Sequence, residues 1–184
     1  MSSLAPALLL SMPQLLDPNF ARSVVLLCTH SDEGAFGLVL NRPVATTGTV
    51  TVHLGQAVST ERELEIWIGG PVEPQRSWLL VAGAPGDPDV AGASRIADGV
   101  YLSNSPDLLR RLLEPDPPAH VRLIVGYSGW GPGQLEAELA ESSWLLSDVD
   151  ADLVFNAPPG GMWERAIRRL GADPAALTTS RGVH

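Results

Sequence analysis

Short apolar runs, many rich in β-branched residues, dominate the first two thirds of the chain, with Gly, Pro and Asp between them. Runs of this kind are typical of buried strands, and the residues between them mark turns. They predict strands at 8–10, 24–29, 36–40, 64–68, 78–81, 100–102 and 121–125. Segment 46–59 has β-branched residues early and a possible helical turn later, so both interpretations stay open.

Helical patterns come later in the chain. Ser105-Pro106-Asp107 is a helix start, with an N-cap, a proline at the first helical position and an acid in the first turn. A second helix is predicted from Gln134 to about Glu141 with Leu135 and Leu139 on one face, and a third over 162–170 with Gly171 as its cap. This order indicates the α+β class. We predict one domain over residues 1–184, with a mixed, strongly bent sheet and helices mainly from the C-terminal half.

The amino-acid composition excludes or disfavours several classes of function. The net charge is −9 and the sequence pI about 4.7, which disfavours a general electrostatic grip on nucleic acid. All 12 basic residues are arginines, so lysine Schiff bases and the P-loop lysine are excluded. Cys28 is the only cysteine, which excludes an intrachain disulfide and a cysteine-rich zinc site. The first residues resemble neither a signal peptide nor a membrane span, so we expect a cytoplasmic protein.

The glycine-rich stretch from Gly126 to Gly133 follows a predicted strand and precedes a helix. It half matches the nucleophile elbow G-x-S-x-G: Gly126 and Ser128 fit, but Trp130 occupies the last glycine position. Its four glycines and the helix start also suit a backbone anion cradle, although acidic residues follow and no arginine lies in the turn. A third interpretation is structural, with glycines at positive φ and Trp130 packed over the turn.

Other candidate groups give weaker signals. Cys28 and His30 alternate on one strand, about 6–7 Å apart, which is too far for a nucleophile and its base. Asp148, Asp150 and Asp152 resemble the start of a calcium loop, but its required glycine and final glutamate are replaced by Leu153 and Pro159. We predict a solvated turn there, in which one Asp could cap a helix. We expect no catalytic residue, metal or cofactor.

Arg42 and Arg76 are the arginines best placed by rigid turns. Either could bind a carboxylate or phosphate, and either could equally pair with an internal acid.

Several motifs together resemble the YqgE/AlgH family of bacterial proteins over nearly the whole chain. They are DPNF at 17–20, EGAFGLVLNRP at 33–43, GGPV at 69–72 with Arg76, GY and GWGPGQLE within 126–136, Trp144, Trp163, Gly171 and Asp173-Pro174. The resemblance implies a bifurcated sheet folded into a pseudo-barrel. It implies no catalytic residue; one branch carries a name linked to regulation of alginate production.

This chain departs from the family pattern at four positions. Ser128 stands where relatives commonly have Ala, which argues against a family serine nucleophile. The other three replace an ionisable residue by a neutral one: Thr29 for Glu, Gln75 for Asp and Val81 for His.

We therefore expect a non-enzymatic accessory or regulatory protein that acts through a protein partner or small ligand, without binding nucleic acid or membrane. The predicted surface comprises Asn41, Arg42, Gly70, Pro71, Arg76, Gly129, Trp130, Gly131, Gly133, Gln134 and Glu136. Two alternatives stay open. One is a hydrolase-like or anion-binding enzyme that uses the turn from Gly126 to Gly133 with Ser128 or His30, and the other is a transcriptional regulator that contacts DNA.

Overall fold

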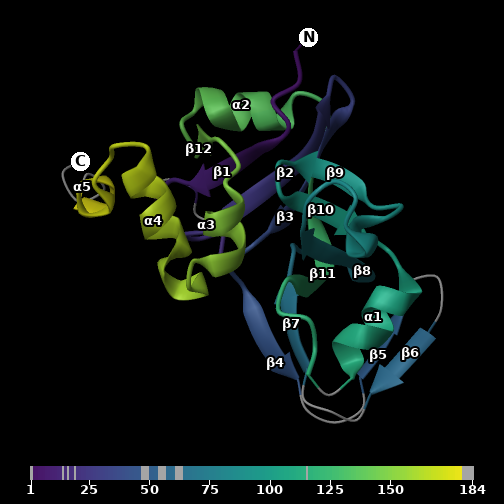
Figure 1. The fold of residues 1–184 in the computed structure, drawn as a ribbon. Helices are drawn as coiled ribbons and strands as arrows, with labels where there is room; N and C mark the ends of the chain where they lie inside the picture. The colour runs from purple at the N-terminus through teal and green to yellow at the C-terminus, as the bar shows by residue number, and fades with distance from the viewer. Residues whose placement is uncertain are drawn as a thin grey trace. The chain divides into compact units, whose positions relative to one another are not determined.

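The computed structural model describes residues 2–13, 15, 17–18, 20–46, 50–53, 57–60, 64–114 and 116–179. The chain folds as two compact units (Figure 1). Unit 1 comprises Met1–Asn41 and Ser128–His184, and unit 2 comprises Arg42–Tyr127. Within the described residues, no helix is both long enough and apolar enough to cross a membrane.

Unit 1 contains an antiparallel sheet with the strand order β12-β1-β2-β3-β11. The strands are β1 (Ala7–Ser11), β2 (Val24–Ser31), β3 (Gly34–Val39), β12 (Trp144–Ser147) and the last three residues of β11 (Val121–Trp130). The apolar runs of β1 and β2 lie at its centre, and their leucines and valines are almost fully buried. These runs form strands because both of their faces are covered.

The helices of unit 1 come from the C-terminal part of the chain. They are α2 (Gln134–Ala140), α3 (Ala151–Asn156), the 3-10 turn η2 (Pro159–Gly161), α4 (Met162–Arg169) and α5 (Pro174–Thr179). Helix α2 lies between β11 and β12 in sequence, and the others come after β12. Helix α4 lies against β1 and β2. Helix α2 contributes Leu135 and Leu139 to a core with Leu9, Trp130 and Trp144, so the predicted shared face of this helix is confirmed.

Unit 2 is built around a second sheet with the strand order β9-β10-β8-β11, extended by β7 beside β11 and β4 beside β7. Its elements are β4 (Pro43–Thr46), β7 (Leu64–Ile68), β8 (Val72–Ala82), η1 (Pro88–Val90), β9 (Ser94–Ala97), β10 (Val100–Ser103) and α1 (Pro106–Leu113), with a separate hairpin of β5 (Val50–His53) and β6 (Ala57–Thr60). Leu108, Leu109 and Leu112 of α1 pack on Leu79 and Leu123 of the sheet.

Strand β11 belongs to both sheets. Up to Val125 it pairs with β8 and, in parallel, with β7; from Ser128 onward it pairs with β3. A register shift lies between Val125 and Tyr127, where Gly126 has φ 72°. The sheet therefore branches at a glycine bulge. This confirms the predicted α+β class and the mixed, bifurcated sheet, whereas a single domain over 1–184 stays a prediction.

The structure corrects two predicted boundaries. Strand β11 continues to Trp130 instead of ending at Val125, because after the bulge it pairs with a new partner, β3. Strand β8 begins at Val72 instead of residue 78, although its residues 73–76 are polar or proline and exposed. Segment 46–59, whose structure was left open, holds β5 and part of β6, and residues 47–49 and 54–56 lie outside the described residues.

The local signals of helix ends are confirmed. The Ser105 hydroxyl accepts a hydrogen bond from Leu108 N (3.3 Å), and the Asp150 carboxylate accepts from Asp152 N and Leu153 N. Gly171 has φ 82° and donates to Arg168 O (2.9 Å), which ends α4.

Candidate functional site

The glycine turn between β11 and α2 is short, and two hydrogen bonds between Gly131 and Gln134 close it. It comprises Gly131, Pro132 and Gly133, all exposed. The side chain of Gln134 accepts a hydrogen bond from Gly131 N (3.1 Å), and Gln134 N donates to Gly131 O (3.1 Å). Gly133 has φ 75° and no side chain to cap the helix, so its backbone enters α2 directly. The result is an exposed loop with a fixed backbone.

Trp130 points into unit 1 and is only 7% exposed. Its ring stacks on Phe20 (centroids 6.5 Å apart) and meets Trp144 edge to face (6.1 Å). The indole N–H groups of Trp130 and Trp144 both donate to Oε2 of Glu138, at 2.7 and 3.1 Å. The structural interpretation of Trp130 is thus supported, with one difference. Trp130 is packed in the core cluster of unit 1 instead of covering the turn.

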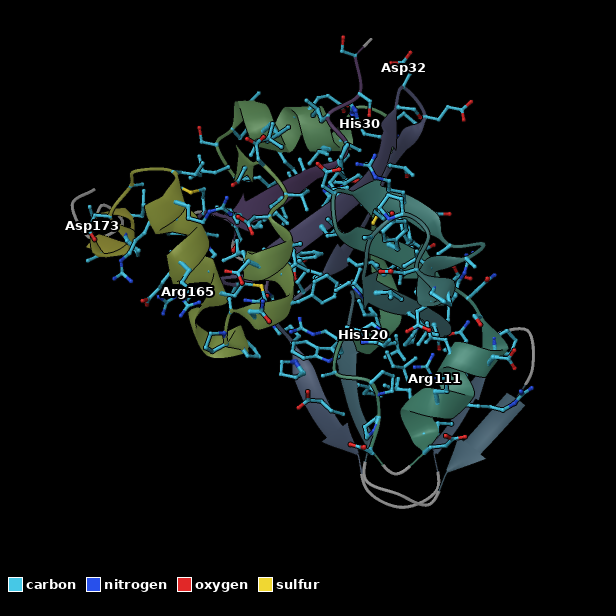
Figure 2. The ribbon with its side chains drawn as sticks, viewed as in Figure 1. His30, Asp32, Arg111, His120, Arg165 and Asp173 are labelled. Carbon is cyan, nitrogen blue, oxygen red and sulfur yellow. The ribbon has the colours of Figure 1, made fainter. Side chains whose placement is uncertain are left out.

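His30 links the start of the chain to α2 (Figure 2). Its side chain is 1% exposed. Nδ1 accepts a hydrogen bond from Leu4 N (3.1 Å), so the proton of the neutral ring lies on Nε2, which donates to Oε1 of Glu136. This bond is the main reason that the pKa of Glu136 is lowered. Both ring nitrogens are therefore engaged internally, and His30 has no free nitrogen to act as a general base.

The two possible nucleophiles near the turn are poorly placed for chemistry. Ser128 is 1% exposed, and its interactions lie within the protein. Burial raises the pKa of the Cys28 thiol to about 12, so the thiol stays protonated at neutral pH. Its Sγ lies 3.5 Å from Leu26 O, to which it donates. Neither side chain is therefore placed to act as a nucleophile.

Gly126 and Gly70 form a close backbone contact within unit 2. A Cβ atom on Gly126 would lie 2.4 Å from Gly70 O, and Gly69 N donates to Val125 O (2.8 Å). Ile68 N in turn donates to Arg42 O (2.9 Å). The structure thus brings Arg42, Gly70 and the residues around Gly126 together, and position 126 requires glycine because a Cβ there would clash with Gly70 O.

The predicted arginines are already engaged. Arg76 lies 3.5 Å from the Glu73 carboxylate and its guanidinium lies 5.2 Å from the centre of the Trp78 ring. Glu73 also accepts a hydrogen bond from Tyr127, which raises the pKa of Tyr127, and has φ 44°. Arg42 is half-buried, and burial lowers its pKa. The internal-pairing alternative therefore describes Arg76.

The predicted surface falls into separate groups. Gly129, Trp130, Gly131, Gly133, Gln134 and Glu136 belong to unit 1, whereas Arg42, Gly70, Pro71 and Arg76 belong to unit 2. Asn41 belongs to unit 1, but it lies two residues beyond the end of β3 and six residues after Ala35, the partner of Trp130, which is up to about 20 Å along an extended chain. The Asn41 side chain accepts from Val24 N and donates to Arg22 O, which gives it a structural role.

Sequence reasoning missed the roles of Glu138 and Leu4. Glu138 gave no signal because its partners, Trp130 and Trp144, lie eight and six residues away in sequence, and their approach depends on tertiary packing. The Leu4 contact with His30 spans 26 residues.

An open hollow of about 410 Å³ in unit 2 was also missed. It is lined by Ala82, Asp87, Pro88, Asp89 and His120. Asp89 binds His120 Nε2 (2.7 Å) and Arg111, and these two bonds lower its pKa. Figure 2 labels His120 and Arg111. Across the part of the chain that the structure describes, no group of three His, Cys, Asp or Glu side chains could hold a metal ion.

The architecture defines an α+β protein with a mixed sheet that branches at a glycine bulge and continues into a closed glycine turn. The sequence profile of the AlgH-like family (DUF179) matches residues 8–175, and the chain belongs to this family.

Its relatives are bacterial proteins of similar length. A UPF0301 protein of Myxococcus xanthus is 42% identical over 187 residues and covers 100% of both chains. A UPF0301 protein of Ruegeria pomeroyi is 38% identical over 181 residues, with 95% of this chain and 96% of the relative covered.

Two solved structures are similar. The solution structure of the AlgH protein from Pseudomonas aeruginosa superposes with a TM-score of 0.70 at 30% identity, over 96% of this chain and 94% of that one. A crystal structure of a protein from Corynebacterium diphtheriae gives a TM-score of 0.66 at 24% identity, over 96% and 90% of the two chains, and supports the fold alone.

Proposed function

We propose that this protein is a non-enzymatic, cytoplasmic accessory or regulatory protein that binds a protein partner through the turn of Gly131, Pro132 and Gly133. One observation carries the proposal: the turn is exposed while every reactive group around it is buried or engaged internally. Ser128 and His30 are almost fully buried, and Glu136 and Glu138 accept hydrogen bonds from His30 and the two tryptophans.

A fixed, exposed backbone suits recognition. A loop that is already ordered loses little conformational entropy on binding, so more of the contact energy contributes to affinity. The hydrogen bonds between Gly131 and Gln134 supply this order, and the buried Trp130 anchors the residue directly before the turn.

The experiment blocks the turn without straining it. A Cβ on Gly131 would have only the Gln134 side chain within 4 Å, at 4.0 Å, and Gly131 does not have positive φ, so Gly131→Tyr adds a ring at the surface. Gly160→Tyr is the matched control, because Gly160 is exposed in unit 1 and has nothing within 4 Å of a Cβ. Each protein is used as bait in cells of the source organism, and captured proteins are quantified by mass spectrometry.

We expect the wild type and Gly160→Tyr to capture the same protein, and Gly131→Tyr to lose it at least tenfold. Equal capture by both variants would contradict the proposal. So would labelling of Ser128 or Cys28 by serine- or cysteine-directed activity probes, which would favour the enzyme hypothesis.

A further inference from the structure

The outer edge of β12 is an open strand edge at the end of the sheet of unit 1. Within the described residues, β12 pairs only with β1 and ends the strand order. Met12 N donates to Ser143 O (2.9 Å), and bonded pairs alternate along an antiparallel ladder. Leu145 and Ser147 therefore face β1, whereas Trp144 and Leu146 direct their backbone N–H and C=O groups away from it.

This edge lacks the usual protection of edge strands. Proteins guard such edges with proline, charged side chains or bulges, and also by keeping them short. In unit 2, the edge strand β4 begins with Pro43, and the edge strand β9 carries Arg95 and a register shift against β10. The sequence of β12 is WLLS, and its pairing with β1 is regular over four residues. Its shortness is the one protection it has.

An apolar side chain continues the core to this edge. Leu146 is paired with Leu9, which is fully buried in the core cluster beneath α2, yet Leu146 is 39% exposed. A strand added beside β12 would extend the same face and cover Leu146. Backbone bonds and one apolar contact of this kind are the means by which extended peptides add to sheet edges.

The charges around β12 indicate the charge of the strand that would be added. Glu141 and Asp148 lie three residues before and one residue after the strand, both exposed, and among the described residues no hydrogen bond or ion pair engages either side chain. Unit 1 as a whole has 11 acidic residues and 5 arginines, a net charge of −6. Two copies joined edge to edge would bring these carboxylates near one another, which disfavours self-pairing.

We infer that the β12 edge binds an extended, basic segment of a partner protein as an added strand. The inference uses other residues than the glycine turn, so it holds whether or not that turn binds a partner.

The test uses a synthetic peptide with alternating valine and threonine in its middle and arginines at both ends. The isotope-labelled full chain is titrated with this peptide and followed by NMR at low and at physiological salt. We expect shift changes centred on residues 144–147, slower hydrogen exchange at the amides of Trp144 and Leu146, and weaker binding as salt rises. A peptide with glutamates in place of the arginines should bind at least tenfold more weakly.

Two kinds of variant test separately how the backbone hydrogen bonds and the charged side chains contribute to peptide binding. Leu146→Pro removes an N–H that points away from β1, so it leaves the β1 ladder intact and should weaken binding at least tenfold. The double variant Glu141→Gln and Asp148→Asn should weaken it several-fold. Asp32→Asn is the charge control, since Asp32 is exposed in the β2–β3 turn (Figure 2) and should leave binding unchanged.

Three results would overturn the inference. One is the absence of binding to the wild type, and another is equal binding to wild type, Leu146→Pro and the double charge variant. The third is a concentration-dependent dimer of the wild type with the same amides protected, since it would mean that a second copy occupies the edge. If Leu146→Pro fails to fold, the double charge variant decides alone, because both of its side chains are exposed.

Discussion

At the scale of single residues, the local contacts at a few positions place unusually specific demands on the residue type. Glu138 binds two buried indoles with one carboxylate oxygen. Gly126 adopts φ 72° within van der Waals distance of another glycine's carbonyl. Neither demand depends on a ligand. Both residue types are therefore required by the fold itself. A loss of function after their substitution would not by itself identify a functional site.

Glu138→Ala should destabilise unit 1 by about 2–4 kcal/mol, because two buried N–H donors lose their acceptor. Glu138→Gln should cost only about 1 kcal/mol, since its amide oxygen can still accept both bonds. The free energy of unfolding from urea denaturation, followed by tryptophan fluorescence, measures both. Equal losses for the two variants would contradict the role given to the acceptor oxygen.

Gly126→Ala should lower the free energy of unfolding by about 2–4 kcal/mol, through positive φ and the contact with Gly70 O. Gly131→Ala is the control and should change it by no more than about 0.5 kcal/mol, because its Cβ would meet only the end of the Gln134 side chain, at 4.0 Å. Thermal and urea unfolding of both variants measure the difference. A neutral Gly126→Ala would mean that the bulge relaxes without cost.

At the scale of elements, interactions between side chains hold irregular segments against helices and strands. Asp89 in η1 binds Arg111 of α1 and His120 just before β11, so it fixes the connection between β8 and β9 to two other parts of unit 2. These bonds lower the pKa of Asp89, the His120 bond being the largest cause. A carboxylate with a lowered pKa stabilises the fold fully above its ordinary pKa, and that contribution is lost as the pH falls through the folded value.

We therefore expect Asp89→Asn to be less stable than the wild type at neutral pH, and the difference to shrink as the pH falls below about 4. Urea denaturation at a series of pH values measures the difference. In an Arg111→Leu background the pH dependence of the same substitution should be smaller, because one cause of the lowered pKa is gone. A difference that is constant with pH would contradict the role of the carboxylate charge.

The elements also show what a sequence can and cannot predict here. Strands β1, β2 and β3 and helices α1, α2 and α4 were predictable because their apolar patterns and caps are local. The extension of β11 to Trp130 was not, since it depends on pairing with β3, some 95 residues earlier in the chain. Strand β12 is four residues long and α3 six, too short for a period to be detected.

The candidate site was less predictable than the fold. The turn at Gly131 to Gly133 was located from sequence, but the contacts that define its surroundings join Leu4, His30 and Glu136, which are far apart in the chain. Asn41 was grouped with the turn because both lie near glycine- or proline-rich breaks. The antiparallel register of β3 and β11 instead separates the two within unit 1.

At the scale of the whole molecule, charge is the dominant property. The net charge of −9 is divided between the units as −6 and −3. A strongly acidic protein repels phosphate backbones and attracts basic partners. Across the molecule, charge thus favours protein recognition over nucleic-acid binding.

We expect no retardation of double-stranded DNA by this protein in a mobility-shift assay at physiological salt, with a basic DNA-binding protein as positive control. Retardation that weakens as the salt concentration rises would contradict this, because such a dependence reports contacts with phosphates. It would also revive the hypothesis of a transcriptional regulator.

The tryptophan cluster has a consequence for how the protein can be observed. Trp130 and Trp144 lie 6.1 Å apart at an interplanar angle of 74°, held by a shared carboxylate and by Phe20. Two indoles fixed in such an asymmetric pair couple their electronic transitions and should produce a strong near-ultraviolet circular dichroism signal. Because both belong to the buried core cluster of unit 1, this signal would report optically, without any label, when the packing of unit 1 loosens.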